Sequence, residues 1–308
     1  MNPLDGMFDQ VLDLPNGQAQ RRLASLIGLD DILSQLLKQA AVLINPRPLE
    51  QWSEQFHGSV LPAVLLVCRR TPLIILAGDV GTGKTTLAET FADTLARSEM
   101  MSIRVMRLSL RTRGAGGTGE ATDRISKAFD VVREETRIHQ AVIMVIDEAD
   151  ALAQSRALKA MHHEDRAGVN ALIRGLDSLV AASARVLAVM CTNRLGAIDP
   201  AVRRRAAGLF VLERPTEAQR HALLANALGD ALKEDEIAEI ARLTGPRNES
   251  GVGYTWSDLS ERLIPSTVLA AYPDNAISYE LLREQLAQTA PTKPFASEDE
   301  SPTRSRRH

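Results

Sequence analysis

The sequence predicts an α/β protein with a doubly wound parallel sheet, followed by a small helical domain. From Leu73 onward, short apolar runs rich in β-branched residues alternate with longer helical stretches, the pattern of a parallel sheet covered by helices on both faces. Beyond residue 214 the β-branched runs stop, and helix-spaced apolar residues follow. A glycine-rich loop joins the first predicted strand to a helical stretch, which is typical of the first unit of such a sheet.

Unbroken apolar runs predict four strands of the sheet and indicate a fifth. Buried parallel strands are apolar on both faces, so runs without alternation are expected. Helices are predicted to begin near Lys84, Gly119 and Arg166 and after Pro200, which gives the crossover lengths that parallel strands need. The predicted strands are Leu73–Ala77, Ile103–Leu108, Val142–Ile146, Val186–Cys191 and Leu209–Leu212.

Four helices are predicted after Pro215, at Ala218–Leu228, Glu234–Leu243, Trp256–Tyr272 and Ser278–Ala287. The residues after 290 are dominated by Pro, Ser, Glu and Arg, a composition that cannot bury enough surface to become ordered. The predicted organisation is therefore a short N-terminal segment at 1–24, a large α/β domain at 25–214, a helical domain at 215–290 and a disordered tail at 291–308.

The composition indicates an ordinary globular protein, with 44% hydrophobic and 24% charged residues. The net charge of -3 does not favour nucleic acid as a partner, because proteins that bind polyanions usually carry a basic excess. The two cysteines, Cys68 and Cys191, give no disulfide framework and fit a reducing compartment. Neither a secretory signal nor an apolar run of membrane-spanning length is evident, so we expect a cytoplasmic protein without a membrane partner.

The glycine-rich loop, residues 78–85, matches the pattern G-x-x-x-x-G-K-[ST]. In such a loop backbone N–H groups surround the phosphates, Lys84 reaches the terminal phosphates and Thr85 offers its hydroxyl to Mg²⁺. The sequence therefore predicts that ATP and Mg²⁺ bind here. The predicted nucleotide-binding residues of the loop and the first helical turn are Asp79, Val80, Gly81, Thr82, Gly83, Lys84, Thr85 and Thr86.

Two adjacent acidic residues, Asp147 and Glu148, follow the predicted strand Val142–Ile146. At the end of a buried strand, Asp147 is expected near Mg²⁺ together with Thr85, and Glu148 is expected to orient and deprotonate the attacking water. The alternative is a solvated acidic turn that caps the next helix. The upstream phosphate loop favours the catalytic interpretation.

Polar residues after two further strands complete the candidate catalytic set. Asn193 follows the strand Val186–Cys191, where it could hydrogen-bond the terminal phosphate and the attacking water, although a turn residue is the alternative. Three consecutive arginines at 203–205 could stabilise the transition state of phosphoryl transfer at a neighbouring subunit's ATP, or could form a solvated basic helix face.

Together these motifs resemble those of the AAA+ ATPases over roughly residues 27–272. Ile27-Gly28-Leu29 is similar to the family's opening segment, which implies that Gly28 lies beside the adenine. The resemblance implies that Asn193 is the sensor, that Arg204 or Arg205 is the arginine finger, and that the chain forms a ring, most often a homo-hexamer. Lys84 and Thr85 resemble the family's Walker A motif, and Asp147 and Glu148 its Walker B motif.

Within AAA+, the chain looks most like the thyroid-receptor-interacting-protein type ATPases that remodel HORMA-domain proteins. The similar segments are the Val169-Asn170-Ala171 helix, Arg205-Ala206, and the stretch from Ile264-Pro265 to Ala271-Tyr272. Bacterial versions are associated with cyclic-oligonucleotide antiphage systems. The resemblance implies an ATP-driven remodeller of a HORMA-domain protein, and a nucleic-acid motor or loader and a nucleotide-dependent switch stay open as alternatives.

Two segments depart from the family pattern. Residues 111–118 occupy the place of the substrate-gripping pore loop, yet they include no aromatic residue, so a tyrosine-based pulling mechanism is not predicted. Residues 256–259 offer no arginine where relatives carry a second sensor, which leaves Arg262 as the candidate substitute.

Overall fold

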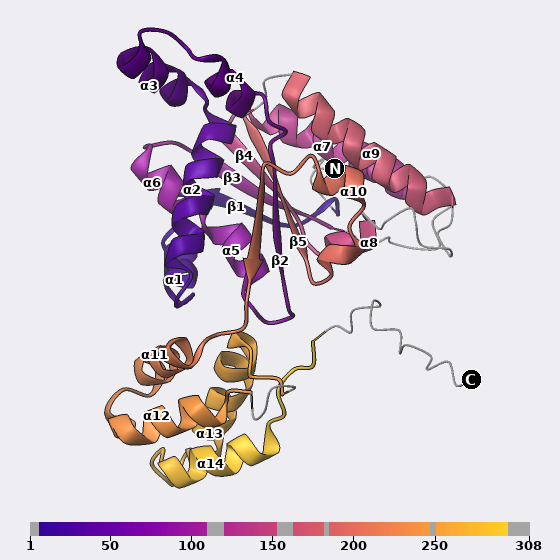
Figure 1. The fold of residues 1–308 in the computed structure, drawn as a ribbon. Coiled ribbons are helices and arrows are strands. Elements are labelled where there is room, and N and C mark those ends of the chain that lie inside the picture. Colours follow the sequence, from indigo (N-terminus) through magenta and orange to yellow (C-terminus); the bar gives the residue numbers. More distant parts are fainter. Residues whose placement is uncertain (1–5, 110–119, 153–162, 182–184, 247–250, 295–308) are drawn as a thin grey trace, which may run out of the picture. The chain divides into compact units, whose positions relative to one another are not determined.

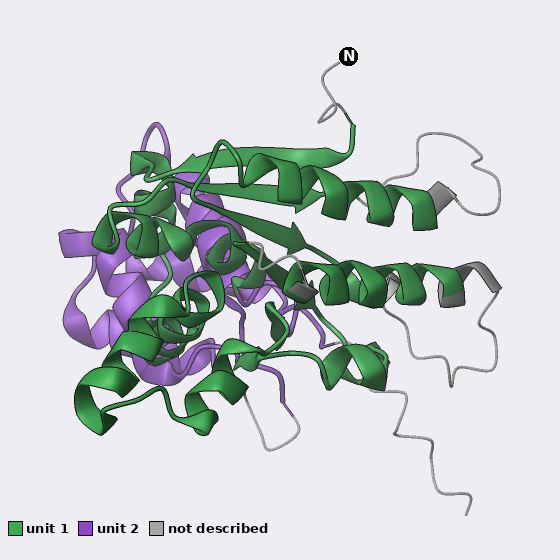
Figure 2. Cartoon of the chain, turned by 90° about the horizontal axis from the view of Figure 1, so that it is seen from above, with its two compact units in different colours: residues 1–77, 83–212 green, residues 78–82, 213–308 purple. Residues whose placement is uncertain are grey.

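The computed structural model describes residues 6–109, 120–152, 163–181, 185–246 and 251–294 (Figure 1). The predicted pore loop at 111–118 and residues 295–308 of the predicted tail lie outside these ranges. The chain divides into two compact units, which Figure 2 distinguishes by colour. The first consists of residues 1–77 and 83–212, and the second of residues 78–82 and 213–308.

The first unit contains a six-stranded sheet in the order β1-β3-β4-β5-β2-β6. The pairs β3–β4, β4–β5 and β2–β5 are parallel, so the predicted doubly wound fold is confirmed. The five predicted strands are present within one or two residues of their expected bounds. The strands are β1 (Phe8–Leu14), β2 (Leu73–Gly78), β3 (Ile103–Leu108), β4 (Ala141–Ile146), β5 (Val186–Thr192) and β6 (Gly208–Leu212).

Strand β1 makes the sheet mixed, because it pairs antiparallel with β3 at the edge. No strand was predicted there from the sequence. Asp13 lies opposite Arg104 in this pairing, and its two carboxylate oxygens accept hydrogen bonds of 2.7 and 2.9 Å from the guanidinium. This ion pair lowers the pKa of Asp13 and joins residues that are 91 positions apart.

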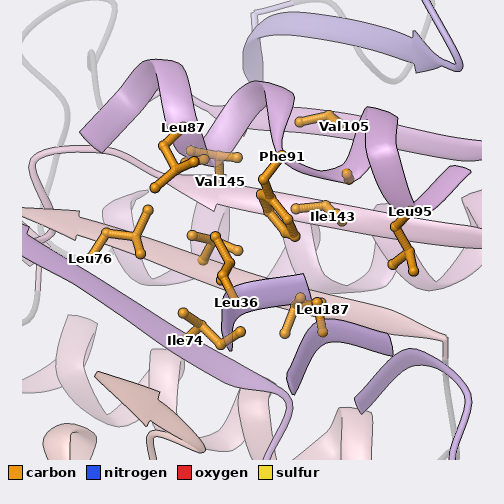
Figure 3. Close-up of a cluster of buried hydrophobic side chains, with 14 of the residues drawn as sticks. Leu36, Ile74, Leu76, Leu87, Phe91, Leu95, Val105, Ile143, Val145 and Leu187 are labelled. Atoms are coloured by element: carbon orange, nitrogen blue, oxygen red, sulfur yellow. The ribbon is translucent and has the colours of Figure 1, made fainter. Parts of the chain in front are cut away.

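Helices cover both faces of the sheet, as a doubly wound fold requires. Alternate residues of the central strands enter different cores. Ile75 and Met144 pack with residues of α7 (Glu120–Glu135) and α9 (His163–Ala181), whereas Ile74 and Ile143 pack with residues of α2 (Asp30–Ile44), α5 (Lys84–Thr90) and α6 (Ala92–Ser98). Figure 3 shows the second cluster, in which the ring of Phe91 lies among strand and helix side chains. All six residues of β4 are buried, which places this strand at the centre of the domain.

The helices of the first unit begin before the sheet's first parallel strand and continue between its strands. They are α1 (Gly17–Ala24), α2 (Asp30–Ile44), α3 (Arg47–His57), α4 (Pro62–Cys68), α5 (Lys84–Thr90), α6 (Ala92–Ser98), α7 (Glu120–Glu135), α8 (Ala149–Leu152), α9 (His163–Ala181) and α10 (Pro200–Arg203). Helix α10 is a single turn that ends at Arg203, so Arg204 and Arg205 follow the helix rather than lying within it.

The second unit is helical in the residues that the structure describes. A capping box between Thr216 and Gln219 begins its first helix, since each residue's side chain accepts a backbone hydrogen bond from the other. Its helices are α11 (Glu217–Leu228), α12 (Glu234–Leu243), a π-helical stretch at Asp258–Leu263, α13 (Ile264–Ala271) and α14 (Tyr279–Gln288). None of the helices in the described part of either unit has the length and hydropathy that crossing a membrane would require.

Candidate nucleotide site

The predicted site residues of the first unit gather at one edge of the sheet. Strands β4 and β5 are parallel neighbours, with Ile146 opposite Met190, so the residues that follow them emerge at the same edge. Strand β2 pairs with β5 on its other side, with Ala77 opposite Thr192. Ligands of open α/β sheets bind outside the carboxyl ends of such strands. This topology brings Asp147 and Asn193 to the edge at which β2 ends and the phosphate loop begins.

The phosphate loop follows β2 and leads into α5. Gly81 and Gly83 have φ angles of +78° and +91°, a conformation that L side chains rarely adopt, so glycine is needed at both positions. Within the loop, the hydroxyl of Thr82 donates to the backbone oxygen of Asp79 at 2.9 Å. Lys84, the first residue of α5, is 6% exposed. The loop's glycines and its own hydrogen bonds therefore contribute to its shape.

Thr85 and Asp147 come together as the sequence analysis expected. The Thr85 hydroxyl donates to Asp147 Oδ2 at 3.0 Å across 62 residues of sequence. Hydroxyl and carboxylate oxygens are the ligand types that Mg²⁺ prefers, and these two share one site. The thiol of Cys191 lies in the same neighbourhood, where burial first and the charge of Asp147 second raise its pKa. Cys191 therefore stays neutral and adds no charge beside this oxygen pair.

Glu148 occupies a strained backbone conformation directly after Asp147. Its φ angle is +48°, which is uncommon for a residue other than glycine and is frequently found at functional sites. The backbone N–H of Glu148 donates to Asp147 Oδ1 at 2.9 Å, which fixes the Asp147 carboxylate relative to the Glu148 backbone. The Glu148 side chain is exposed, whereas that of Asp147 is half-buried. Glu148 is thus accessible to water, as a general base requires.

Asn193 follows β5 at the same edge and is half-buried. The preceding residue, Thr192, is 1% exposed, and its hydroxyl donates to Asp150 Oδ1 at 3.1 Å. The Thr192 hydroxyl also accepts the backbone N–H of Arg194 at 3.0 Å. These bonds fix the backbone on both sides of Asn193 and tie it to α8, the helix that follows Glu148.

The two candidate arginine fingers differ in what they contact. Arg205 is paired with Asp177 of α9, to which Nε donates at 3.1 Å and Nη2 at 3.3 Å. Its hydrogen bond to Asp177 raises the pKa of Arg205. Arg204 is exposed, and its side chain forms no hydrogen bond or ion pair with the described residues. Arg204 is therefore the candidate whose guanidinium is available to another molecule.

The predicted opening segment lies beside the phosphate loop. A Cβ added to Gly83 would lie 3.1 Å from Leu26 Cδ2, so the chain just before Gly28 contacts the last glycine of the loop. Gly28 itself has a φ angle of +74° and precedes α2. Of the two remaining predicted residues, Val80 is exposed and Thr86 is half-buried.

The contact between Arg214 and Asp79 in the loop was not predicted from the sequence. Arg214, two residues after β6, donates from Nε to Asp79 Oδ2 at 2.7 Å, and both residues belong to the second unit. No local pattern could have indicated a pair 135 positions apart. The candidate second sensor, Arg262, donates instead to Asp258 at 2.8 Å and to the backbone oxygen of Ala290 at 3.0 Å.

Comparison with known proteins agrees with this geometry. Residues 74–214 match the ATPase family associated with various cellular activities (AAA). The chain is 46% identical over 301 residues to CD-NTase-associated protein 6 of Escherichia coli (strain MS 115-1), covering 95% of this chain and 97% of the relative.

Two solved structures show the same likeness in three dimensions. A chain in the structure of the E. coli MS115-1 HORMA:CdnC:Trip13 complex has a TM-score of 0.90 at 46% identity, covering 95% of this chain and 99% of that one. The structure of Rhizobiales Trip13 has a TM-score of 0.73 at 41% identity, covering 94% and 100%. The chain therefore belongs to the AAA family of ATPases, in the group of CD-NTase-associated protein 6 and bacterial Trip13, and its AAA domain implies ATPase activity with a bound nucleotide and a divalent metal ion.

Proposed function

We propose that this protein hydrolyses ATP in the presence of Mg²⁺ and uses the energy to remodel a HORMA-domain protein. The arrangement of Thr85, Asp147 and Glu148 supports the chemistry, because two oxygen ligands lie 3.0 Å apart and an exposed carboxylate follows them. The likeness to a chain of a HORMA:CdnC:Trip13 complex, at a TM-score of 0.90, supports the partner.

Each site residue has a distinct role in this proposal. Lys84 neutralises charge on the terminal phosphates, and Thr85 and Asp147 hold Mg²⁺. Glu148 accepts a proton from the attacking water, so the strained backbone that presents it is part of the catalytic apparatus. Asn193 orients the same water, and its rigid backbone supports that role.

Assembly into a homo-hexameric ring supplies the last catalytic group. A guanidinium from a neighbouring subunit stabilises charge in the phosphoryl-transfer transition state, an effect worth about 10³–10⁵ in rate. The exposure of Arg204 and the pairing of Arg205 with Asp177 favour Arg204 for this role. Arg205 then holds the turn that presents Arg204, since its Nη1 donates to the backbone oxygen of Ala201 at 3.2 Å.

The test uses ATP turnover with and without a HORMA-domain protein from the same genome. Stimulation of turnover by that protein is the expected result, and Glu148→Gln should capture the protein in the presence of ATP without turning over. Glu54→Gln is the matched control, because Glu54 is an exposed residue of α3 outside the site. Stimulation by single-stranded DNA at physiological salt, without any effect of the HORMA-domain protein, would favour a nucleic-acid motor instead.

A further inference from the structure

The phosphate loop of this protein contains a carboxylate. Asp79 is the first residue after β2 and lies five residues before Lys84. The loop must accept a polyphosphate, and a negative charge of its own opposes that binding by Coulomb repulsion. Among residues 78–85, Asp79 is the single acidic residue. Tight nucleotide binding therefore requires something that offsets this charge.

Arg214 meets that requirement. Its Nε donates to Asp79 Oδ2 at 2.7 Å, within the range of charge-assisted hydrogen bonds. The Arg214 side chain is 16% exposed and that of Asp79 is 28% exposed, so solvent screens their attraction less than it would screen that of a surface pair. Arg214 Nη1 also donates to the backbone oxygen of Gly253 at 2.6 Å, which fixes the guanidinium in place.

A second contact holds the same part of the loop. The backbone N–H of Ser257 donates to the backbone oxygen of Gly81 at 3.1 Å. A Cβ at Gly81 would lie 2.6 Å from Thr255 Oγ1, so the loop and the segment at 255–257 are in close contact. Residues 79–81 belong to the second unit, and two contacts within that unit hold this part of the loop.

We propose that Arg214 is a positioning residue for ATP binding, which neutralises Asp79 and holds the phosphate loop in the shape that receives the triphosphate. This inference rests on the proposed ATPase function. Arg214 acts through Asp79 and does not touch the reacting atoms. Its loss removes the guanidinium that offsets the charge of Asp79, and removing the carboxylate as well should relieve the defect. A role confined to folding predicts no such relief.

The experiment measures the Kd of a fluorescent ATP analogue, the kcat and KM for ATP, and the unfolding temperature. Three variants are compared with the wild type: Arg214→Ala, Asp79→Asn and the double variant. Arg214→Ala should raise Kd about 10- to 50-fold, because the charge of Asp79 then repels the triphosphate without the adjacent guanidinium. The double variant should return to within about threefold of the wild type, the non-additivity expected of a directly interacting pair. Arg242→Ala is the control, because Arg242 forms an exposed ion pair elsewhere in the same unit.

Ionic strength provides an independent readout. The Arg214→Ala defect should shrink between about 0.05 and 0.5 M salt, because the Debye length falls over this range. An unchanged Kd in Arg214→Ala would overturn the proposal. So would a double variant whose Kd is as high as that of Arg214→Ala and whose unfolding temperature is lower than that of the wild type. Either result would leave the ATPase function intact. A wild-type protein that neither binds nor hydrolyses ATP would overturn the proposed function itself.

Discussion

Asp258 is a buried acidic residue of the second unit, and its removal should strongly destabilise that unit. Its carboxylate is 1% exposed and accepts four hydrogen bonds that join the start of the π-helical stretch to the chain after α14. The backbone N–H groups of Thr255 and Thr292 donate to Oδ2, each at 2.9 Å. The Thr292 hydroxyl and Arg262 Nη1 donate to Oδ1, at 2.6 and 2.8 Å. Asp258→Ala removes all four acceptor contacts at once.

The expected cost follows from the burial of these donors. Thr255 is fully buried, so its N–H loses its acceptor without access to water, which costs about 1–3 kcal/mol. Arg262 is 47% exposed, so loss of its ion pair contributes at most about 1 kcal/mol. With about 0.5–1.5 kcal/mol for each of the two half-buried Thr292 contacts, the sum is about 2–7 kcal/mol. A loss of about 4 kcal/mol, near the middle of that range, corresponds to a fall of about 16–32 °C in unfolding temperature for a unit of this size.

Differential scanning calorimetry and amide hydrogen exchange at Thr292 test this expectation. Asp258→Asn keeps one acceptor oxygen and should lose about half as much stability. Asp274→Ala is the control, because Asp274 is exposed. If Asp258→Ala unfolded within about 2 °C of the control and left Thr292 exchange unchanged, the account of this cluster would be wrong.

The pKa of Asp258 also predicts how the stability of the second unit depends on pH. Burial alone would raise the pKa of Asp258, but hydrogen bonds from Thr255 and Thr292 outweigh burial and hold the pKa below its usual value. A lowered pKa means that the stabilisation is present above the unfolded pKa and is lost as pH falls through the folded one. The second unit should therefore lose stability in acid below about pH 4, and Asp258→Asn should lack this component.

The remaining predictions concern the arginine finger and the core. Arg204→Ala should lower ATP turnover by about 10³-fold. Mixing Arg204→Ala subunits with Glu148→Gln subunits should restore part of the turnover. If the mixture recovered no turnover, Arg204 would not act across a subunit boundary. Arg205→Ala should cost less than about tenfold, because its guanidinium is already paired within its own subunit. Gly175→Ala should lower the free energy of unfolding, measured by urea denaturation, by about 1–3 kcal/mol, because the new Cβ would lie 2.2 Å from the Phe129 ring. An unchanged free energy of unfolding would show that α7 and α9 can move apart without loss of stability.

The sequence was informative where structure depends on neighbouring residues or on the order of parallel strands. The strand β4 was predictable because all its residues are apolar and buried, so no exposed position interrupts the run. The meeting of Thr85 with Asp147 was predictable from topology, because β2 and β4 both run parallel to β5 and end at the same sheet edge. The catalytic roles of the site residues remain predictions.

Contacts between distant residues that neither a local pattern nor the order of parallel strands indicates were not predictable. Strand β1 contains acidic residues that weaken its apolar alternation, and the partner of Asp13, Arg104, lies 91 positions away. The contact of Asp79 with Arg214 likewise joins the loop to a residue in another part of the sequence. An isolated charged residue carries no local signal of its partner, so such pairs become visible only when the chain is folded.

ATP binding and ATP turnover, measured on the same preparations of wild type, Lys84→Ala and Glu148→Gln, test the central claim most directly. Glu148→Gln should bind ATP as tightly as the wild type and turn it over at least about 100-fold more slowly, because only water activation is lost. Lys84→Ala should fail to bind, because charge neutralisation at the phosphates is lost. Normal turnover by Glu148→Gln, or its failure to bind ATP, would contradict the assignment of Glu148 and with it the proposed mechanism.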